Sequence, residues 1–372
     1  MKKILFFIAE DYSVLSHRLA LLKMTRELGY EVVVATKVSN HKEQLESEGF
    51  KVIPIKNLHR SGLNPFKDLK LLHELFQIYR TEKPDTSYHV AFKPVIYGGL
   101  AALLTRVPHV IYALGGLGTL YLGQSLKVKI VRFAVNRIFS LLFHRKNSSL
   151  ILQNDDDAKS ITGLFPPKQL HMIRGSGVDI NYYSPTPEPK GSIVITMAAR
   201  LLWDKGVGEL IDAARLIKEK QKDIQIHLYG EPDPENPNSV SLHELKNWHE
   251  EGIIQWHGPA KDSREAYRNC HIAVLPSYRE GLPKGLLEAA ASGRPIVTTD
   301  VPGCKDTVID GVSGYIVPVK NANMLADRLL DLANSPNKRA AFGKRGRSLV
   351  EEQFSDTFIN TQLTTVIKNS SQ

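Results

Sequence analysis

The sequence has few cysteines, no long apolar run and, across one long stretch, no acidic residue. Its two cysteines, Cys270 and Cys304, have neither CxxC spacing nor histidines nearby, which argues against a disulfide framework and against structural zinc. No apolar run reaches the roughly 18 to 20 residues that a membrane span needs. We therefore expect a protein of the reducing cytosol, either soluble or peripheral to a membrane.

The N-terminal segment MKKILFFIAEDYS resembles a secretory signal, because two lysines precede an apolar run. The run stops after about six residues, at Glu10 and Asp11, which is too short for the apolar region of a signal peptide. We interpret the segment as a buried first strand and expect a cytoplasmic location.

The stretch from Thr86 to Asn154 contains no aspartate or glutamate. Its eight basic residues are Lys93, Arg106, Lys127, Lys129, Arg132, Arg137, Arg145 and Lys146. The whole chain has a formal net charge of +9, so nearly all the excess positive charge lies in this one sector. Such a field favours an anionic partner.

Short β-branched or aromatic runs alternate with segments of helical periodicity along all 372 residues. This rhythm is typical of βαβ units and a parallel, doubly wound sheet. The expected strands are 3–9, 31–37, 51–55, 87–91, 109–114 and 150–154, followed by 193–198, 224–230, 253–258, 271–277, 295–300 and 314–319. A Pro-rich link at 177–192 separates the two series. The predicted fold class is α/β, with one Rossmann-like domain at 1–180 and another at 190–355.

Helical periodicity is clear at 17–27 and 65–80, and the C-terminal segment 356–372 also has a helical pattern. We expect this last helix to pack back on the first domain. A functional cleft between the two domains is the expected arrangement for such a pair.

The segment SYREGLPKGLLEAAASGRPIVTTD, residues 277–300, places Glu280 after an expected strand and Glu288 within an expected helix. Open α/β sheets bind ligands at the carboxyl ends of their strands. The turn SYREGLP (277–283) would end the strand, and KGLLEAAASG (284–293) would form the helix. Backbone N–H groups around Gly281 and Leu282, just before the helix, would then hold an anion such as a diphosphate. Glu288 would face neutral hydroxyl groups, since a carboxylate repels phosphate. The alternative for the two glutamates is an ordinary solvated pair.

Two cations occupy a matching position at the start of the second domain, in ITMAARLLWDKG. Arg200 follows a strand and Lys205 precedes a helix. Arginine clamps phosphate oxygens and lysine supplies a point charge. Either residue alone would be a surface charge as readily as a ligand, but together they predict a nucleotide-diphosphate site that needs no metal.

These residues resemble the retaining nucleotide-sugar glycosyltransferases of family 4, whose fold is called GT-B. The resemblance rests on Arg200, Lys205, Glu280-Gly281-Leu282-Pro283 and Glu288, on Gly293-Arg294-Pro295, and on the segments 175–185 and 310–318. It implies that the residue at Glu280 contacts the donor sugar, the one at Glu288 the ribose, and those at Arg200 and Lys205 the diphosphate.

The first half is similar to the branch that extends lipid-linked saccharides of bacterial O-antigen, capsule or glycoprotein glycans, through HVAFKPVIYGGLAALL (89–104) and VIYALGGLGTLY (110–121). The chain departs from many relatives after the first strand, where it has AEDYSVLSH in place of a glycine-rich loop. It also has ALGGLG where many relatives have a histidine, so no catalytic histidine is carried over. Gly116 and Gly118 are candidates for close approach to the donor. His17 and His89 are candidates for substrate contact, each with a structural role as the alternative.

Asp155, Asp156 and Asp157 suggest a divalent-cation site of the DxD kind. They follow an expected strand and precede a helical segment, so a helix cap with first-turn charges is the simpler interpretation. We expect no metal and no other cofactor.

The segment 126–147 combines basic and apolar residues at helical spacing. A basic amphipathic helix is suited to an anionic membrane surface, and the alternative is a core-facing helix with a solvated basic face. The sector has no recognised nucleic-acid motif or stacking aromatics, so nucleic acid is not an expected partner.

The sequence thus predicts a retaining, metal-independent glycosyltransferase, peripheral on the inner face of the cytoplasmic membrane. It would transfer a hexose or N-acetylhexosamine from a nucleotide-sugar, with UDP as the expected nucleotide, to a polyprenyl-diphosphate-linked saccharide. The alternatives are a GT-B nucleotide-sugar epimerase, which needs no acceptor, and a catalytically silent sugar-nucleotide-binding protein.

Overall fold

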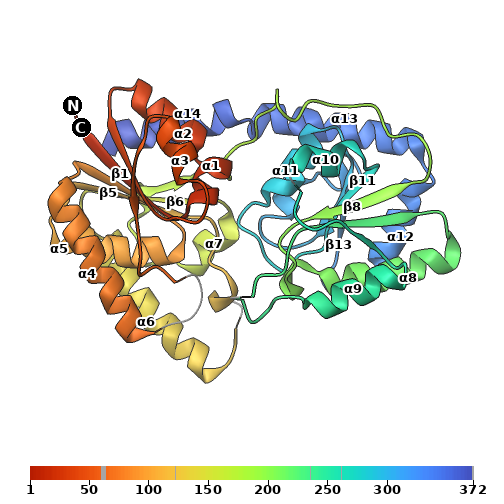
Figure 1. Ribbon diagram of the computed structural model, residues 1–372, viewed down its shortest axis with the longest axis horizontal. Coiled ribbons are helices and arrows are strands. Elements are labelled where there is room, and N and C mark those ends of the chain that lie inside the picture. The colour runs from red at the N-terminus through yellow and green to blue at the C-terminus, as the bar shows by residue number, and fades with distance from the viewer. Residues whose placement is uncertain (60–63, 122, 235, 261, 371–372) are drawn as a thin grey trace. The chain divides into compact units, whose positions relative to one another are not determined.

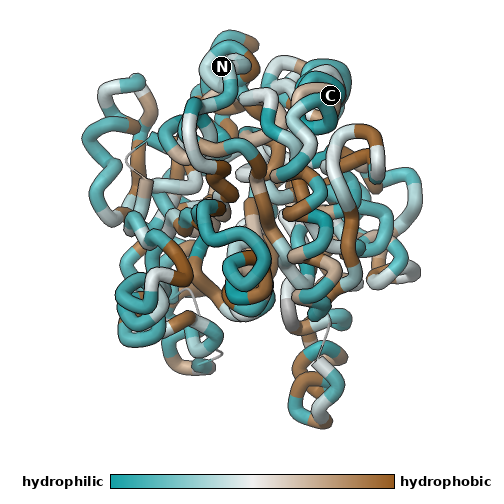
Figure 2. Tube along the Cα trace, turned by 90° about the vertical axis from the view of Figure 1, so that its right-hand side faces the viewer, coloured by the Kyte–Doolittle hydropathy of each residue, from teal (hydrophilic) through white to brown (hydrophobic). Residues whose placement is uncertain are grey.

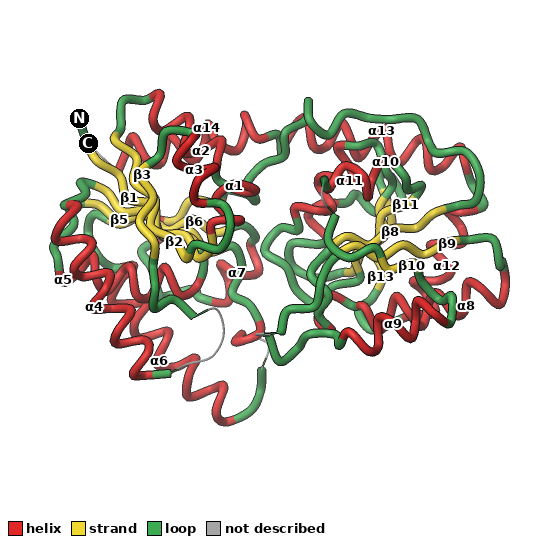
Figure 3. The backbone as a smooth tube through the Cα atoms, viewed as in Figure 1, coloured by secondary structure: helices red, strands yellow, loops and turns green. Residues whose placement is uncertain are grey.

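The computed structural model describes residues 1–59, 64–121, 123–234, 236–260 and 262–370, and the chain divides into two units (Figure 1). Unit 1 comprises Met1–Gly177 and Thr357–Gln372, and unit 2 comprises Val178–Asp356. Each unit contains one parallel sheet with helices on both of its faces (Figure 3). The predicted class, α/β with two Rossmann-like domains, is confirmed.

Unit 1 is built on a seven-stranded sheet with the order β3-β2-β1-β4-β5-β6-β7. Its strands are β1 (Lys3–Glu10), β2 (Glu31–Lys37), β3 (Lys51–Pro54), β4 (Thr86–Val90), β5 (His109–Leu114), β6 (Ser148–Leu152) and β7 (Leu170–Met172). Its α-helices are α1 (Asp11–His17), α2 (Leu19–Glu27), α3 (Lys42–Ser47), α4 (Pro65–Glu82), α5 (Gly99–Leu104), α6 (Leu126–Phe143), α7 (Asp155–Ser160) and the C-terminal α14 (Asp356–Ser370). Short helical turns are η1 (Pro94–Gly98), η2 (Thr119–Tyr121) and η3 (Pro167–Gln169).

The central strands of unit 1 are apolar on both faces because helices cover both sides of the sheet. On β1, Leu5 and Phe7 pack with α4, α5 and α6, whereas Ile4, Phe6 and Ile8 pack with α1, α2 and α14. Hydrophobic stretches of the chain run through the interior, and the outer helices alternate between hydrophilic and hydrophobic residues (Figure 2). The C-terminal helix α14 thus completes the second of the two layers.

Unit 2 is built on a six-stranded sheet with the order β10-β9-β8-β11-β12-β13. Its strands are β8 (Val194–Ala198), β9 (Gln225–Tyr229), β10 (Gln255–Trp256), β11 (Ile272–Leu275), β12 (Ile296–Thr299) and β13 (Gly314–Val317). Its helices are α8 (Val207–Lys220), α9 (Leu242–Glu250), α10 (Ser263–Arg268), α11 (Lys284–Ala291), α12 (Ala322–Ala333) and α13 (Pro336–Gln353), with the turns η4 (Trp203–Lys205) and η5 (Lys305–Thr307).

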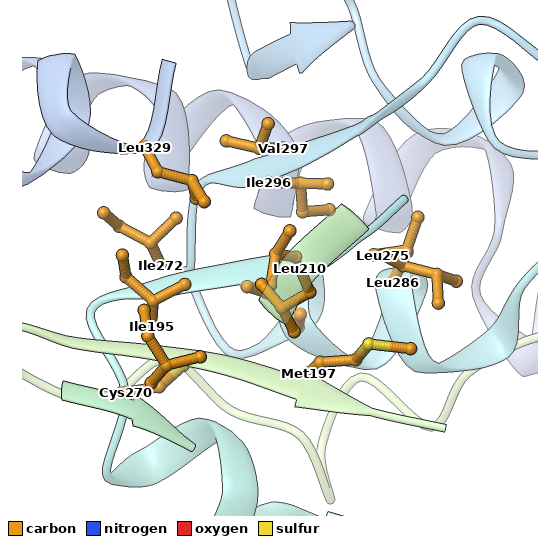
Figure 4. Close-up of a cluster of buried hydrophobic side chains, with 14 of the residues drawn as sticks. Ile195, Met197, Leu210, Cys270, Ile272, Leu275, Leu286, Ile296, Val297 and Leu329 are labelled. Carbon is orange, nitrogen blue, oxygen red and sulfur yellow. The ribbon is translucent and has the colours of Figure 1, made fainter. Parts of the chain in front are cut away.

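One continuous core cluster fills unit 2. Ile195, Ile272 and Ile296 come from three adjacent strands, and they lie among Leu210 of α8 and Leu329 of α12 (Figure 4). Cys270 belongs to this cluster and, like Cys304, is a free buried thiol. Burial raises the pKa of both thiols to about 12, so neither is a ready nucleophile.

Several elements differ from the sequence expectations. The helix expected at 17–27 is α2 at Leu19–Glu27, and the separate helix α1 that precedes it was not expected. The strand expected at 150–154 occupies Ser148–Leu152, and β7 was not expected. For the C-terminal helix expected at 356–372, positions 371–372 lie outside the described residues.

Candidate active site

Arg200, Lys205 and Glu280 follow two neighbouring strands of unit 2. β8 pairs with β9 on one side and with β11 on the other, and β12 and β13 extend the sheet beyond β11. The strand order therefore reverses between β8 and β11, which makes their carboxyl ends the switch point where open α/β sheets bind ligands.

The ammonium group of Lys205 forms an ion pair with the carboxylate of Glu280. Their side chains are only 15% and 13% exposed, so the pair is shielded more than an ordinary surface pair. Lys205 ends the turn η4, and Gly206 follows it with φ +76°. A Cβ at Gly206 would collide with the carbonyl oxygen of Pro276, so glycine allows the turn after β8 to lie against the end of β11.

The loop after β11 is fixed by backbone contacts on two sides. The N–H of Tyr278 donates to the carbonyl of Asp204 at 2.8 Å, and the hydroxyl of Tyr278 donates to Glu209 at 2.6 Å. The N–H of Glu280 donates to the carbonyl of Pro302 at 3.1 Å. These bonds hold Glu280 beside Lys205.

Gly303 brings the loop after β12 against the Glu280 loop. Its φ is +80°, and a Cβ there would collide with the carbonyl oxygen of Gly281 and lie 2.7 Å from that of Glu280. A side chain at this position is excluded both by the backbone conformation and by the close approach.

The helix after Glu280 begins where the sequence predicted it. α11 starts at Lys284 and is preceded by Pro283. Gly281 and Leu282 therefore lie in the loop before the helix, as predicted for the turn at 277–283. Gly285, in the first turn of α11, packs closely, since a Cβ there would lie 2.9 Å from the hydroxyl of Tyr267.

Glu288 is largely buried on α11, and its carboxylate lies 3.9 Å from the ammonium group of Lys284. Burial raises the pKa of Glu288, although the charge of Lys284 and the hydroxyl of Tyr183 oppose the rise. The hydroxyl of Tyr183 also shares a hydrogen bond with Ser263. The sequence did not distinguish Tyr183 from an ordinary core aromatic residue, so its contact with Glu288 was not predicted.

Arg200 is more exposed than Lys205 and lies farther from its carboxylate partner. Its guanidinium group lies 3.6 Å from the carboxylate of Asp233, and its side chain is about half exposed. Within the described part of the chain, no hydrogen bond or ion pair joins Arg200 to the Lys205–Glu280 pair. The structure therefore places both cations at the same strand end but gives them different carboxylate partners.

The candidate residues of unit 1 are more scattered. Gly116 and Gly118 follow β5 with φ values of +141° and +63°, and the backbone conformation alone explains glycine at both positions. His17 is exposed at the end of α1, and its Nδ1 atom lies 2.6 Å from the Ser16 hydroxyl.

His89 is a core residue, which corrects the expectation that it contacts an acceptor. It is fully buried, and its Nε2 atom lies 2.9 Å from the hydroxyl of Tyr79. Burial, reinforced by the charge of Arg145, lowers the pKa of His89 to about 3, so the imidazole is neutral at physiological pH.

Asp155, Asp156 and Asp157 occupy the first turn of α7, as the capping interpretation predicted. The side chain of Asn154 accepts a 2.8 Å hydrogen bond from the N–H of Asp157 and caps the helix. Within the described ranges, no group of three or more His, Cys, Asp or Glu side chains is arranged to hold a metal ion.

The helix expected at 126–147 ends at Phe143 and exposes an apolar stripe. Leu126, Ile130, Phe133 and Leu141 are 75%, 61%, 61% and 57% exposed, and their spacing puts them on one side of α6. Lys127, Lys129 and Arg137 are also exposed on this helix. We call these seven residues the α6 face.

Two of the basic residues in this segment have structural roles instead. Arg132 donates to the carbonyls of Leu120 and Gly123, and Arg145 donates to the carbonyl of Val107. The opposite side of α6, including Phe139 and Leu142, is buried in the core of unit 1. None of the described helices combines the length and the apolar character that a membrane span requires.

Known proteins resemble the chain along nearly all its length. Residues 3–145 match the family "Glycosyl transferase 4-like", and residues 181–349 match "Glycosyl transferases group 1". The N,N'-diacetylbacillosaminyl-diphospho-undecaprenol α-1,3-N-acetylgalactosaminyltransferase of Campylobacter jejuni is 30% identical over 346 residues, or 89% of each protein. The capsular polysaccharide glycosyltransferase CapM of Staphylococcus aureus is 27% identical over 351 residues, or 92% of this chain and 90% of CapM.

Among solved structures, HepE of Anabaena in complex with UDP and glucose aligns with a TM-score of 0.77 at 19% identity, covering 99% of this chain and 100% of HepE. The similarity confirms the fold, and the group 1 match covers the part of the chain that carries Lys205, Glu280 and Glu288. The chain therefore belongs to the group 1, family 4-like glycosyltransferases of GT-B fold.

Proposed function

We propose that this glycosyltransferase moves a hexose or an N-acetylhexosamine from a UDP-sugar to a polyprenyl-diphosphate-linked saccharide, with retention of configuration and without a metal ion. The observation that carries the donor side is the Lys205–Glu280 pair at the switch point of unit 2. One cation and one carboxylate side by side suit a ligand in which a diphosphate adjoins a polyhydroxylated sugar. UDP and glucose in the HepE complex support this choice of donor.

In the proposed donor complex, Lys205 and Arg200 neutralise the diphosphate while Glu280 accepts hydrogen bonds from the sugar hydroxyls. The N–H groups at the start of α11 add the positive end of a helix dipole. Glu288 accepts from the ribose hydroxyls, for which its carboxylate must be ionised. Gly281 and Leu282 line the diphosphate through their backbone.

We propose front-face transfer. The bond between the anomeric carbon and the diphosphate oxygen breaks, the acceptor oxygen bonds to the same face of that carbon, and the departing oxygen takes the acceptor's proton. Lys205 and Arg200 stabilise the charge that develops on the diphosphate. The enzyme contributes mainly positioning and electrostatics.

Unit 1 binds the acceptor in this proposal, and the α6 face rests on anionic lipid. The four exposed apolar side chains suit the acyl region of a membrane, and the three cations beside them suit its anionic headgroups. The relative from C. jejuni, whose name specifies an undecaprenol-linked acceptor, supports a lipid-linked substrate. The enzyme would then work at the inner face of the cytoplasmic membrane.

The test is to incubate the protein with a UDP-sugar and a purified lipid-linked saccharide in the presence of EDTA. Mass spectrometry should show a product larger by one sugar, and NMR of the new linkage should show the anomeric configuration of the donor. An inverted linkage would refute the retaining mechanism. Activity that requires a divalent cation would refute the metal-independent one, and a changed sugar without a changed acceptor would favour an epimerase.

A further inference from the structure

Lys93 lies at the switch point of the sheet in unit 1. β1 pairs with β4, β2 and β3 extend the sheet on one side, and β5, β6 and β7 extend it on the other. The carboxyl ends of β1 and β4 therefore flank the place where such a sheet binds a ligand. In unit 2 the equivalent place carries the Lys205–Glu280 pair, and in unit 1 Lys93 follows the end of β4 by three residues.

The backbone before and after Lys93 departs from regular geometry. Ala91, the first residue after β4, has φ +83°, which is a strained value for a residue with a Cβ. Its N–H donates to the carbonyl of Ala113 on β5 at 3.1 Å. The chain then forms η1, a π-helical turn, directly after Lys93. Strained residues and π-helical turns are both concentrated at functional sites.

The ammonium group of Lys93 has an incomplete set of partners. It lies 3.8 Å from the carboxylate of Asp68 on α4, and the two side chains are 16% and 14% exposed. Among the described residues, Asp68 is its one ion-pair partner, although an ammonium group carries three donors. Burial lowers the pKa of Lys93 despite the nearby carboxylate, which means that Asp68 compensates only part of the desolvated charge.

Asp68 is itself occupied by other donors. The N–H of Asn64 donates to its Oδ2 atom at 3.1 Å. The hydroxyl of Tyr97 lies near the same carboxylate, and burial together with this interaction raises the pKa of Tyr97. Asp68 thus holds the ammonium group of Lys93 near the carboxyl end of β4 but neutralises its positive charge only in part, since Tyr97 and Asn64 also interact with this carboxylate. The elements that follow β4, up to Asn154, contain no carboxylate that would repel an anion.

We propose that Lys93 binds a phosphate oxygen of a prenyl diphosphate, the group that joins the saccharide of a lipid-linked acceptor to its lipid. This inference rests on the proposed function and deepens it, since it assigns recognition of the acceptor's charged linkage to one residue. A lysine ammonium with open donors in a shielded position forms strong, charge-assisted hydrogen bonds to phosphate.

The direct test measures binding of farnesyl diphosphate by titration calorimetry, with farnesol as the uncharged probe. Lys93→Met should weaken binding of the diphosphate at least about 10-fold, which is the usual effect of one charge-assisted hydrogen bond. Lys93→Arg should recover most of the affinity, and farnesol should not distinguish the variants. Lys42→Met is the matched control, because Lys42 also has one carboxylate partner, Glu46 at 3.5 Å, but lies in the open on α3.

Equal affinity of wild type and Lys93→Met for farnesyl diphosphate would overturn the proposal, as would a wild-type protein that does not bind it. Circular dichroism checks that the variants fold, and Lys93→Gln replaces Lys93→Met if the latter does not. Binding to vesicles rich in phosphatidylglycerol distinguishes recognition of a prenyl diphosphate from recognition of lipid headgroup phosphates. Lys93→Met should bind them like wild type, and a matching loss on vesicles would assign Lys93 to lipid headgroups instead.

The transfer reaction separates this inference from the proposed function. With one saccharide presented either on a short prenyl diphosphate or on a plain alkyl chain, Lys93→Met should lower kcat/KM at least about 10-fold for the diphosphate only. Equal losses on both acceptors would refute diphosphate recognition while leaving the transferase assignment intact. If wild type transfers to neither acceptor, the proposed function fails, and the farnesyl diphosphate titration still decides the role of Lys93.

Discussion

Lys205 and Glu280 are 75 positions apart in the chain and form an ion pair at adjacent strand ends of unit 2. The pair is shielded from solvent, and each side chain balances the charge of the other. In the proposed donor complex, the diphosphate would replace Glu280 as the partner of the ammonium group, and the carboxylate would accept hydrogen bonds from sugar hydroxyls. Lys205 and Glu280 would thus exchange each other for two different parts of one ligand, the diphosphate and the sugar.

Lys205→Ala and Glu280→Gln should have different kinetic effects. Without Lys205, both nucleotide affinity and turnover should fall, with kcat reduced about 100-fold, because the leaving charge loses a stabilising contact. Glu280→Gln keeps the shape but frees Lys205 from its counter-charge, so UDP should bind as tightly or more tightly while kcat falls. UDP titration and steady-state kinetics measure the two effects. Unchanged UDP affinity in Lys205→Ala would remove Lys205 from the diphosphate site.

Gly303→Ala should damage activity through the position of the Glu280 loop. The added methyl group would push the loop after β12 away from the carbonyls of Gly281 and Glu280, and we expect at least a 10-fold loss of kcat, since small misplacements of catalytic groups have effects of this order. Gly311→Ala is the control: Gly311 has a similar φ of +69°, but nothing lies within 4 Å of its Cβ position. Equal activity of the two variants would contradict the account.

Arg294 should matter for stability more than for chemistry. It is 1% exposed, and its guanidinium group donates to Thr186 and to the backbone carbonyls of Tyr267, Pro187 and Arg268. Arg294→Met leaves these acceptors unpaired and should lower the free energy of unfolding of unit 2 by about 3 kcal/mol. Urea denaturation compares it with Arg215→Met, which removes an exposed arginine. A loss below about 1 kcal/mol would contradict this role.

His89 should make the protein less stable in acid. The pKa of His89 in the fold is about 3, against an ordinary value of 6.5. Below pH 6.5 the imidazole therefore binds a proton in the unfolded chain but stays neutral in the folded protein. The stabilisation is fully present above pH 6.5 and is lost as the pH falls, approaching about 1.4 kcal/mol per pH unit for one proton. His89→Gln should flatten the pH dependence of the unfolding free energy by nearly that slope between pH 6 and 5. An unaltered slope would show that His89 is protonated in the fold.

The α6 face should determine binding to anionic vesicles. Replacing Lys127, Lys129 and Arg137 by glutamine should weaken binding about 100-fold, since each such cation contributes about 1 kcal/mol near an anionic membrane. The effect should diminish at high salt. A matched triple change of Lys218, Lys220 and Lys222 in unit 2 should have little effect. Co-sedimentation that is equal for both triple variants would refute the membrane assignment.

The sequence could predict the strands because buried parallel strands are continuous apolar runs, as in β1. It could not predict β7, which has three residues and no fully buried side chain. The position of the charged residues at the ends of β8 and β11 followed from the rule for open sheets. The Lys205–Glu280 partnership did not, because it depends on which loops the sheet brings together.

Burial was the property hardest to predict. His89 is a polar residue in the buried strand β4, and only the packed sheet shows that it meets Tyr79 rather than solvent. Arg132 and Arg145 were likewise predicted from the sequence to belong to a basic surface, but in the structure they donate to backbone carbonyls.

The central claim is that the Lys205–Glu280 site uses a nucleotide-sugar for transfer to a lipid-linked saccharide. The most direct measurement is release of the nucleotide diphosphate from a panel of UDP-, GDP- and ADP-sugars, in EDTA, with and without an extract of bacterial lipid-linked saccharides. Release from a UDP-sugar should rise with the extract and should fall about 100-fold in Lys205→Ala. Binding of a UDP-sugar with no release under either condition would contradict it and favour a silent binding protein.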